Sequence, residues 1–364
     1  MRLFFSAGEA SGDDYGAAIL RKISELAPGK FQAEAVGMAR LESAGAKIIA
    51  DSRTWGVISI IQSLKVYPRC LLAFQKVKKA LRTGPPGIAI PIDFGFFNVR
   101  FAKYAKSHGW KVVYFSPPGA YRKDRQGKNL PELSDAIVTP FPWSCEILKS
   151  MGANAYFFGH PMKEMVANRG AARDPNRIGL LPGSRHAEIG ELLPVLADAV
   201  RDLPHVCEFA VAQTVTADEL RRKWAELCPG RKQDLFTEGD VSGVLSRSLA
   251  AVCCSGTVTL TAAICQTPQV VVYRVTKAME REARLLRFKP GIISQPNILL
   301  GRVFLPELIQ HEATGSAIRK QLEPLLTDSK ERQAQLDGYA ELSGMLGGDD
   351  AITQTAQLIL EMAN

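Results

Sequence analysis

Short apolar runs alternate with helical patterns along most of the chain, and this alternation constrains the fold more than any other feature. The runs cover 2–7, 31–36, 47–50, 87–92, 110–115, 136–139 and 155–158, then 178–181, 207–212, 235–237, 250–254 and 269–273. Parallel strands need a crossover connection, usually a helix, so this rhythm predicts parallel sheets covered on both faces. The length of 364 residues exceeds the usual size of a single core. We predict an α/β chain of two Rossmann-like, doubly wound domains.

The expected domain boundary follows the motif Gly159-His160-Pro161-Met162, where a polar segment at 168–177 precedes the next apolar run. Composition shifts of this kind are typical of linkers. We assign 1–165 to an N-terminal domain and 166–347 to a C-terminal domain. The pattern from 305 to 364 is helical, with a break near Gly347-Gly348. The last helix, 348–364, is expected to cross back to the first domain.

The balance of charge favours an anionic partner. Lys and Arg number 45 against 37 Asp and Glu, which gives a formal charge of +8 and a pI near 9.1. Nucleic acid is disfavoured because the basic residues are dispersed and lack an interleaved aromatic platform. The seven cysteines show no CxxC pair and no histidine at metal-ligand spacing, as expected of reduced thiols in a cytoplasmic protein. No metal site is predicted.

Polar residues follow the strands of the first half. Gly8, Glu9 and Ser11 come after the first run, and the run 87–92 delivers Asp93 to a strand end. Ligands of doubly wound sheets bind beyond these strand ends. The glycine spacing is not GxGxxG and no acidic residue lies at the right distance to hold an NAD ribose, which disfavours a nicotinamide site. Asp93 could act as a general base or as the N-cap of the next helix, and both interpretations stay open.

The second half offers two turns suited to a phosphate. The stretch 178–189, IGLLPGSRHAEI, predicts a strand, a tight turn with Ser184 and Arg185, and a helix. The turn Ser255-Gly256-Thr257 opens another helix. Free N–H groups at helix N-termini and the arginine fork both suit a diphosphate. An ordinary corner with a solvated arginine is the alternative for the first turn. Nearby, Arg274 ends a strand, and the loop 294–297 with Asn297 offers a carboxamide for a base or phosphate.

The segment 55–82 combines aliphatic side chains with six lysines and arginines. A basic amphipathic element of this kind could enter the headgroup region of an anionic membrane. An ordinary pair of helices packed on the sheet is equally consistent with the pattern. No run in the chain is long enough to cross a bilayer, so membrane contact would be peripheral.

Taken together, these motifs resemble one family, lipid-A-disaccharide synthase, an inverting glycosyltransferase of the GT-B fold. The likeness spans nearly the full length. It is carried by Ala7-Gly8-Glu9-Ala10-Ser11-Gly12-Asp13, Ile92-Asp93 with Asn98, Ser116-Pro117, Gly159-His160-Pro161-Met162, Leu181-Pro182-Gly183-Ser184-Arg185 with Glu188, Ser255-Gly256-Thr257, and Pro296-Asn297 with Gly301-Arg302.

The resemblance implies transfer of 2,3-diacylglucosamine from its UDP carrier to 2,3-diacylglucosamine 1-phosphate, giving a β-1,6-linked disaccharide and UDP without a metal ion or cofactor. It also implies a cytoplasmic enzyme, peripheral on the inner membrane, with a homodimer left open. Asp93 would be the base for the acceptor 6-hydroxyl, on the acceptor and membrane side of an interdomain cleft. Arg185 would lie on the UDP side, facing Asp93. The residues that would hold UDP are Arg185, Ser255, Gly256, Thr257, Arg274 and Asn297.

Three departures from the family pattern bear on activity. The family's D-x-P-D-F-N run is here Asp93-Phe94-Gly95-Phe96-Phe97-Asn98, so the second aspartate is lost. The W-A-W segment after Ser116-Pro117 is replaced by Pro118-Gly119-Ala120-Tyr121-Arg122, and Thr261 stands where a glutamate normally binds the ribose. A UDP-sugar enzyme with another acceptor, an epimerase, and a silent nucleotide- or lipid-binding paralogue are the alternatives.

Overall fold

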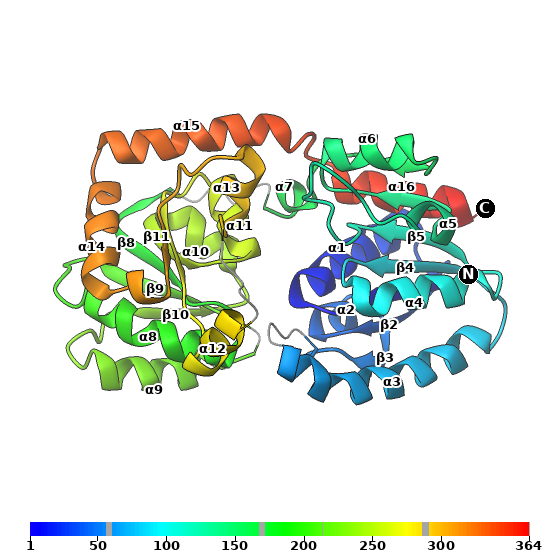
Figure 1. Ribbon diagram of the computed structural model, residues 1–364, viewed down its shortest axis with the longest axis horizontal. Helices are drawn as coiled ribbons and strands as arrows, with labels where there is room; N and C mark the ends of the chain where they lie inside the picture. The colour runs from blue at the N-terminus through cyan, green and yellow to red at the C-terminus, as the bar shows by residue number, and fades with distance from the viewer. Residues whose placement is uncertain (56–59, 167–171, 213, 286–290, 364) are drawn as a thin grey trace. The chain divides into compact units, whose positions relative to one another are not determined.

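The computed structural model describes residues 1–55, 60–166, 172–212, 214–285 and 291–363 (Figure 1). The chain forms two compact units, each with its own parallel sheet. The first unit contains Met1–Met165 and Met345–Asn364, and the second contains Val166–Gly344. The predicted class, two Rossmann-like domains with parallel sheets, is confirmed.

The first unit is built on a seven-stranded sheet of order β3-β2-β1-β4-β5-β6-β7 in which every pairing is parallel. The direction in which successive strands are added reverses between β1 and β4, and the crevice beyond such a reversal is where doubly wound sheets bind ligands. The strands are β1 (Arg2–Ala7), β2 (Gln32–Gly37), β3 (Lys47–Asp51), β4 (Ile88–Ile92), β5 (Lys111–Phe115), β6 (Ala136–Val138) and β7 (Ala155–Tyr156).

Helices cover both faces of this sheet. Phe4 of β1 packs with Val77 of α3 and Phe101 of α4 in one buried cluster. Since successive side chains of a strand point to opposite faces, its buried neighbours Leu3 and Phe5 point to the other face. The helices are α1 (Ala10–Leu26), α2 (Ala39–Ser43), α3 (Ile60–Arg82), α4 (Gly95–Lys106), α5 (Leu130–Leu133), α6 (Pro142–Ser150), α7 (Pro161–Val166) and α16 (Ala351–Ala363).

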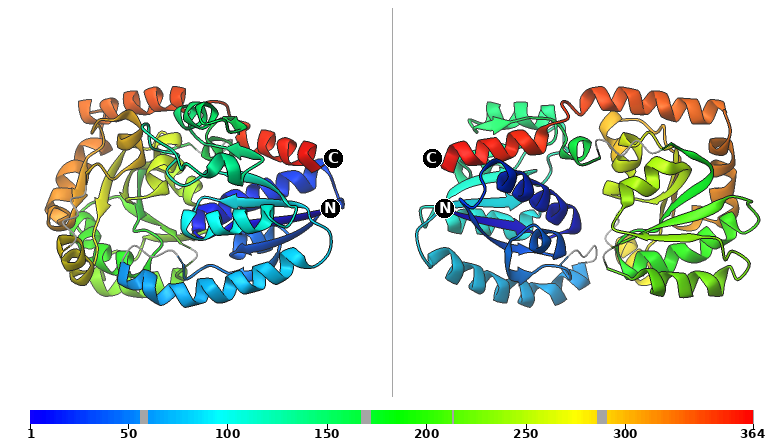
Figure 2. Two further views of the ribbon diagram at one scale, coloured as in Figure 1. Left: turned by 45° about the vertical axis from the view of Figure 1, so that its right-hand side comes forward. Right: turned by 180° about the vertical axis from the view of Figure 1, so that it is seen from behind.

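The C-terminal helix α16 lies beside α1 in the first unit (Figure 2). The Glu164 carboxylate accepts hydrogen bonds from the Ile352 and Thr353 amides, at 2.6 and 3.1 Å, and so caps the start of α16. The Lys163 ammonium donates to the Gly347 carbonyl at 2.6 Å. The chain therefore returns to the first unit through contacts made by α7.

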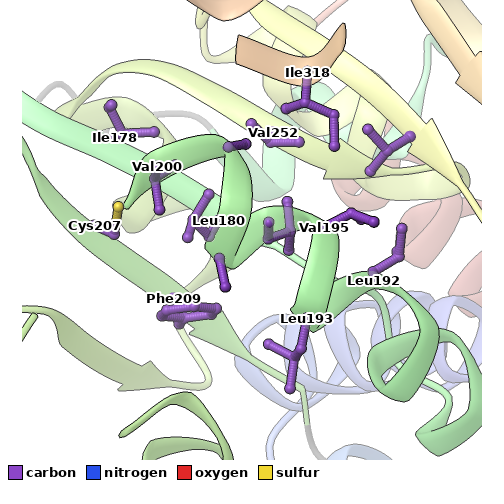
Figure 3. Close-up of a cluster of buried hydrophobic side chains, with 14 of the residues drawn as sticks. Ile178, Leu180, Leu192, Leu193, Val195, Val200, Cys207, Phe209, Val252 and Ile318 are labelled. Carbon is purple, nitrogen blue, oxygen red and sulfur yellow. The ribbon is translucent and has the colours of Figure 1, made fainter. Parts of the chain in front are cut away.

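The second unit repeats the topology with a six-stranded parallel sheet of order β10-β9-β8-β11-β12-β13, which reverses between β8 and β11. Figure 3 shows its core, where Leu180 of β8 and Val252 of β11 meet Leu192 of α8. The strands are β8 (Asp174–Leu181), β9 (Val206–Val211), β10 (Leu235–Glu238), β11 (Ser248–Cys254), β12 (Gln269–Tyr273) and β13 (Glu307–Ile309). The helices are α8 (His186–Val200), α9 (Ala217–Leu227), α10 (Val241–Arg247), α11 (Thr257–Ile264), α12 (Lys277–Leu285), α13 (Gln295–Leu300), α14 (Gly315–Leu322) and α15 (Lys330–Met345).

Two predictions about local structure are wrong. The region 305–364 is not helical throughout, because Glu307–Ile309 form β13 and pair in parallel with β12. The polar segment 168–177 is not a linker over its whole length, because β8 already begins at Asp174. Polar side chains enter β8 because they find partners, as when the Arg177 guanidinium donates to Glu208 at 2.7 Å. Residues 167–171 of that segment lie outside the described residues.

Candidate functional site

Asp93 follows β4 at the reversal point of the first sheet and has an unusual backbone. Its φ is +45°, and Phe94 follows with a φ of +42°. Residues other than glycine rarely occupy this left-handed region, and such conformations cluster at functional sites. Helix α4 begins at Gly95 with Phe94 as its N-cap, so Asp93 is not the helix cap. The N-cap alternative is thereby excluded, and the carboxylate stays available beyond the strand end.

The side chain of Asn98 holds this turn in place. Its amide nitrogen lies 2.8 Å from the Ile92 carbonyl and 3.0 Å from the Asp93 carbonyl, while its oxygen accepts from the Ser6 hydroxyl at 2.6 Å. The buried Tyr114 hydroxyl donates to the same Asp93 carbonyl at 3.1 Å. These bonds connect β1, β4, β5 and α4. The strained turn is therefore fixed by its surroundings before any ligand binds.

Electrostatics favour a proton-accepting role for Asp93. Asp93 is exposed, yet the surrounding protein displaces water from its carboxylate, and this desolvation together with the nearby Glu9 charge raises its pKa to about 6. Glu9 is the N-cap residue of α1, directly after β1. The charges of two of the predicted residues, Glu9 and Asp93, thus act on one another. A carboxyl group with a raised pKa is a better general base near neutral pH than an ordinary aspartate.

The other predicted residues of this half lie around the same turn. Gly8 is buried under the Phe94 ring, and a Cβ at Gly8 would lie 2.2 Å from two ring carbons. Ser11 belongs to the first turn of α1, because the helix begins at Ala10, earlier than the predicted loop allows. The Asp13 amide donates to the Glu9 carbonyl at 3.0 Å and closes that turn. Gly8 is needed for close packing at this position.

Arg185 lies at the corresponding point of the second sheet, after β8. Gly183 has a φ of +101°, and a Cβ there would lie 2.9 Å from the Glu188 carboxylate. That carboxylate is buried and lies 2.7 Å from the Arg185 guanidinium. The charges of Arg185 and Glu188 also act on Cys254, the last residue of β11, and on Tyr273 at the end of β12. Arg185 is therefore held over the strand ends at the reversal point.

The turn Ser255-Gly256-Thr257 lies directly beside it, after β11. Gly256 is the N-cap of α11, has a φ of +142°, and has open space around its Cβ position. The Ser255 hydroxyl donates to the Ile293 carbonyl at 2.9 Å, which holds the loop before α13 against the turn. Ser184 and Arg185 precede α8, and Arg274 follows β12. The predicted diphosphate residues thus come together on one edge of the second sheet.

Asn297 is the exception among them. Its carboxamide donates to the Leu305 carbonyl and to Glu307, at 3.0 and 2.7 Å, and accepts from the Phe304 and Leu305 amides. Asn297 is fully buried. A saturated, buried carboxamide favours a role in positioning α13 over direct contact with a nucleotide. On the same helix, Gln295 has a buried carboxamide oxygen without a partner.

Two departures from the family pattern have structural consequences. The Thr261 hydroxyl donates to the Thr257 carbonyl within α11 at 3.2 Å, so it is engaged in its own helix. Phe96 is 54% exposed, and its ring lies 6.0 Å from that of Tyr67 on α3. The first change removes an acceptor for ribose hydroxyls. The second replaces a carboxylate with an exposed aromatic ring three residues after Asp93.

Sequence reasoning named no role for two residues that shape the site. Glu188 orients Arg185, and Tyr114 holds the Asp93 turn. Tyr114 lies on β5 and its partner Asp93 follows β4, so no rule of sequence spacing identifies Tyr114. Glu188 lies three residues after Arg185, a separation at which helical side chains meet, and that spacing was the available signal. In the part of the chain that the structure describes, no group of three His, Cys, Asp or Glu side chains could hold a metal ion.

Comparison with known proteins identifies the family. The model of the family described as lipid-A-disaccharide synthetase matches residues 3–356. The chain belongs to the lipid-A-disaccharide synthase family. The synthase of Trichlorobacter lovleyi is 32% identical over 99% of this chain and 97% of its own length, and that of Myxococcus xanthus is 31% identical over the same shares. The predicted family and its enzyme class, a hexosyltransferase, are confirmed.

Solved structures share the fold at much lower identity. The Staphylococcus aureus MnaA–UDP structure has a TM-score of 0.63 at 12% identity, covering 99% of this chain and 96% of that one. Acinetobacter baumannii MurG has a TM-score of 0.57 at 13% identity, covering 99% of both chains. These neighbours place the chain among the GT-B glycosyltransferases and epimerases by fold. The synthase family, in contrast, matches by sequence over nearly the whole chain.

Proposed function

We propose that this chain transfers 2,3-diacylglucosamine from its UDP carrier to the 6-hydroxyl of 2,3-diacylglucosamine 1-phosphate, forming the β-1,6 lipid A disaccharide and releasing UDP. The family match over residues 3–356 carries this proposal. It includes all the positions singled out at the two reversal points. The epimerase alternative is supported by fold alone, because the two UDP-N-acetylglucosamine 2-epimerase structures from Listeria monocytogenes and Methanocaldococcus jannaschii are 16% and 11% identical.

In the proposed reaction, the first unit binds the acceptor and Asp93 removes the proton of its 6-hydroxyl as the oxygen attacks the anomeric carbon. The bond from that carbon to the UDP oxygen breaks, and attack from the opposite side inverts the configuration. A pKa of about 6 leaves Asp93 mostly ionised at neutral pH and able to accept the proton. Asn98 and Tyr114 act as positioning residues through the Asp93 backbone.

The second unit binds the donor. Negative charge develops on the diphosphate as its bond to the sugar breaks, and donors fixed in advance stabilise such charge most effectively. Arg185, held by Glu188, supplies a planar fork of donors. The other proposed contacts to the UDP donor on this edge of the second sheet come from Ser184, Ser255, Gly256, Thr257 and Arg274. Glu9, Gly8 and Ser11 complete the acceptor edge of the first unit.

The test is incubation of the protein with UDP-diacylglucosamine and diacylglucosamine 1-phosphate, with products identified by mass. A β-1,6 disaccharide and an equal amount of UDP support the proposal. Release of UDP and an epimerised sugar without acceptor would favour the epimerase. Saturable UDP binding without turnover of this or any other donor would favour a silent paralogue.

We further propose peripheral contact with an anionic membrane through α3 of the first unit. Val66, Val77 and Leu81 of this helix are buried in the core, as an ordinary packed helix requires. Its other side exposes Tyr67, Leu71 and Leu72 beside Arg69 and Lys76. Residues 56–59 of the predicted element lie outside the described residues. None of the helices that the structure describes is both long and apolar enough to cross a bilayer.

Sedimentation with lipid vesicles tests this contact. The protein should bind vesicles containing phosphatidylglycerol more strongly than purely zwitterionic ones, and the double variant Leu71→Ser/Leu72→Ser should lose this binding. Leu26→Ser, an exposed leucine on α1, is the control and should bind as the parent does. Equal loss in both variants, or no dependence on lipid charge, would count against the proposal.

A further inference from the structure

One carboxylate of the second unit fixes the segment 293–297, which leads into α13 and forms its first turn. We call this stretch the α13 segment. The Glu307 carboxylate on β13 accepts hydrogen bonds from the Ile293 amide at 2.9 Å and from the Ser294 amide and hydroxyl at 3.0 and 2.6 Å. It also accepts from the Asn297 carboxamide at 2.7 Å. Both ends of the α13 segment are therefore held by the same group.

The α13 segment lies directly beside the turn after β11, which is proposed to bind the diphosphate. The Ser255 hydroxyl of that turn donates to the Ile293 carbonyl at 2.9 Å. Thr259 of α11 makes a second connection, because its hydroxyl accepts from the Gln295 amide at 3.3 Å and donates to the Gly256 carbonyl at 2.8 Å. The backbone of Gln295 is therefore only two hydrogen bonds away from the N-cap residue of α11.

The polar side chains of the α13 segment differ in their hydrogen bonding. Ser294 and Asn297 are buried and bonded to Glu307. The Gln295 side chain is partly exposed, and its carboxamide oxygen is buried without a hydrogen-bond partner among the residues that the structure describes. A buried acceptor without a partner destabilises a fold. The packing of α13 therefore does not account for the carboxamide at position 295.

The missing partner of this oxygen has to be a hydrogen-bond donor, because the carbonyl oxygen of a carboxamide only accepts. The oxygens of an ionised diphosphate also only accept, so the diphosphate itself cannot be the partner. A nucleotide sugar carries O–H and N–H groups on its sugar and on its nucleoside. Both parts are joined to the diphosphate, so both begin close to a turn that holds it.

We propose that the Gln295 carboxamide oxygen accepts a hydrogen bond from a hydroxyl or N–H group of the bound donor. This inference rests on the proposed function and adds a donor-binding residue to those of the turns after β8 and β11. Glu307 fixes the backbone around Gln295 before the donor binds, so the contact costs little further ordering of the chain.

The test compares Gln295→Met with the parent in neutral detergent micelles. Methionine keeps the unbranched shape of the side chain and removes both polar atoms. We expect the donor KM to rise about fivefold, as loss of one hydrogen bond between neutral groups predicts, and the acceptor KM to stay within about twofold. The melting temperature should be equal or higher, because the variant removes an unpartnered buried acceptor. Gln333→Met on α15, an exposed glutamine of the same unit, is the control and should keep the parent's donor KM.

The affinity for UDP, measured by calorimetry, identifies the part of the donor that binds Gln295. Unchanged UDP affinity in Gln295→Met assigns the contact to the sugar, and a loss equal to the change in donor KM assigns it to the nucleoside. Three results would overturn the inference: an unchanged donor KM, the same change in Gln333→Met, or a fall in melting temperature that accompanies the rise in donor KM. The last would give Gln295 a structural role.

Failure of the proposed function is a separate outcome, seen when the parent forms no disaccharide. Calorimetry with UDP-diacylglucosamine then decides about Gln295. Weaker binding by Gln295→Met than by the parent and Gln333→Met supports the inference. Equal binding by all three proteins, or no binding by the parent, overturns it.

Discussion

The turns at the two reversal points share a topology and differ in almost everything else. The turn after β4 uses residues other than glycine in left-handed conformations, and the charge of a second carboxylate, Glu9, acts on Asp93. The turn after β8 uses Gly183 and places a guanidinium, held by Glu188, over the strand ends. The same strand order thus presents a carboxylate, the proposed proton acceptor, in one unit and a guanidinium, proposed to bind the diphosphate, in the other. The chemistry of each unit is set by the residues that follow its strands.

Replacing the proposed base should have the largest effect. Asp93→Asn keeps the size of the side chain, and asparagine tolerates the left-handed backbone, so the fold should survive. Loss of general-base catalysis typically costs about 10²- to 10⁴-fold, and we expect kcat to fall by that amount. The measurement is disaccharide formation at saturating donor and acceptor. A kcat within threefold of the parent would remove Asp93 from the mechanism.

Removal of the guanidinium in the second unit should have the next largest effect. Hydrogen bonds to charged groups contribute about 1.5–3 kcal/mol, so Arg185→Ala should raise the donor KM about 10- to 100-fold. Arg185→Lys keeps a charge beside the buried Glu188 but lacks the planar fork, so its donor KM should lie between those of the parent and Arg185→Ala. Arg201→Ala, an exposed arginine at the end of α8, is the control. Equal donor KM values for Arg185→Ala and the control would show that Arg185 does not hold the donor.

Glu188→Gln sharpens the comparison by testing a positioning residue. The variant removes the charge that orients Arg185 but leaves the arginine in place. We expect the donor KM to rise about fivefold, corresponding to roughly 1 kcal/mol for one hydrogen bond. The double variant Arg185→Ala/Glu188→Gln should be no worse than Arg185→Ala alone, because Glu188 acts through Arg185. Additive effects would mean that Glu188 acts independently.

The smallest effect concerns pH. The raised pKa of Asp93, about 6, predicts that kcat/KM falls as the pH drops through 6, because the protonated carboxyl cannot accept a proton. Glu9 raises this pKa, so Glu9→Gln should move the acidic limb to lower pH and leave the neutral plateau nearly unchanged. Kinetics between pH 4.5 and 8 would measure the shift. A limb that moves to higher pH would contradict the assigned electrostatics.

The sequence predicts the features that depend on neighbouring residues, such as the strands and the turns after them. The structure adds the features that depend on residues distant in the sequence, such as the partners of a buried side chain. The apolar runs located most strands, and the residues after them located both turns, because a strand end places the next side chains at the sheet edge. The three-residue strand β13 was missed because Glu307–Ile309 is too short to show a pattern. Asn297 was predicted to bind a ligand, but its partners, Leu305 and Glu307, saturate it. The left-handed Asp93 depends on Asn98 and Tyr114, which are brought together only by folding.

The most direct test is the UDP affinity of the parent, Asp93→Asn and Arg185→Ala, measured by calorimetry. It tests whether the second unit binds the UDP donor without help from Asp93 of the first unit. We expect Asp93→Asn to bind UDP within twofold of the parent and Arg185→Ala to bind it at least about tenfold more weakly, because a charged hydrogen bond is lost. Weakened binding by Asp93→Asn, or parental affinity in Arg185→Ala, would contradict this expectation.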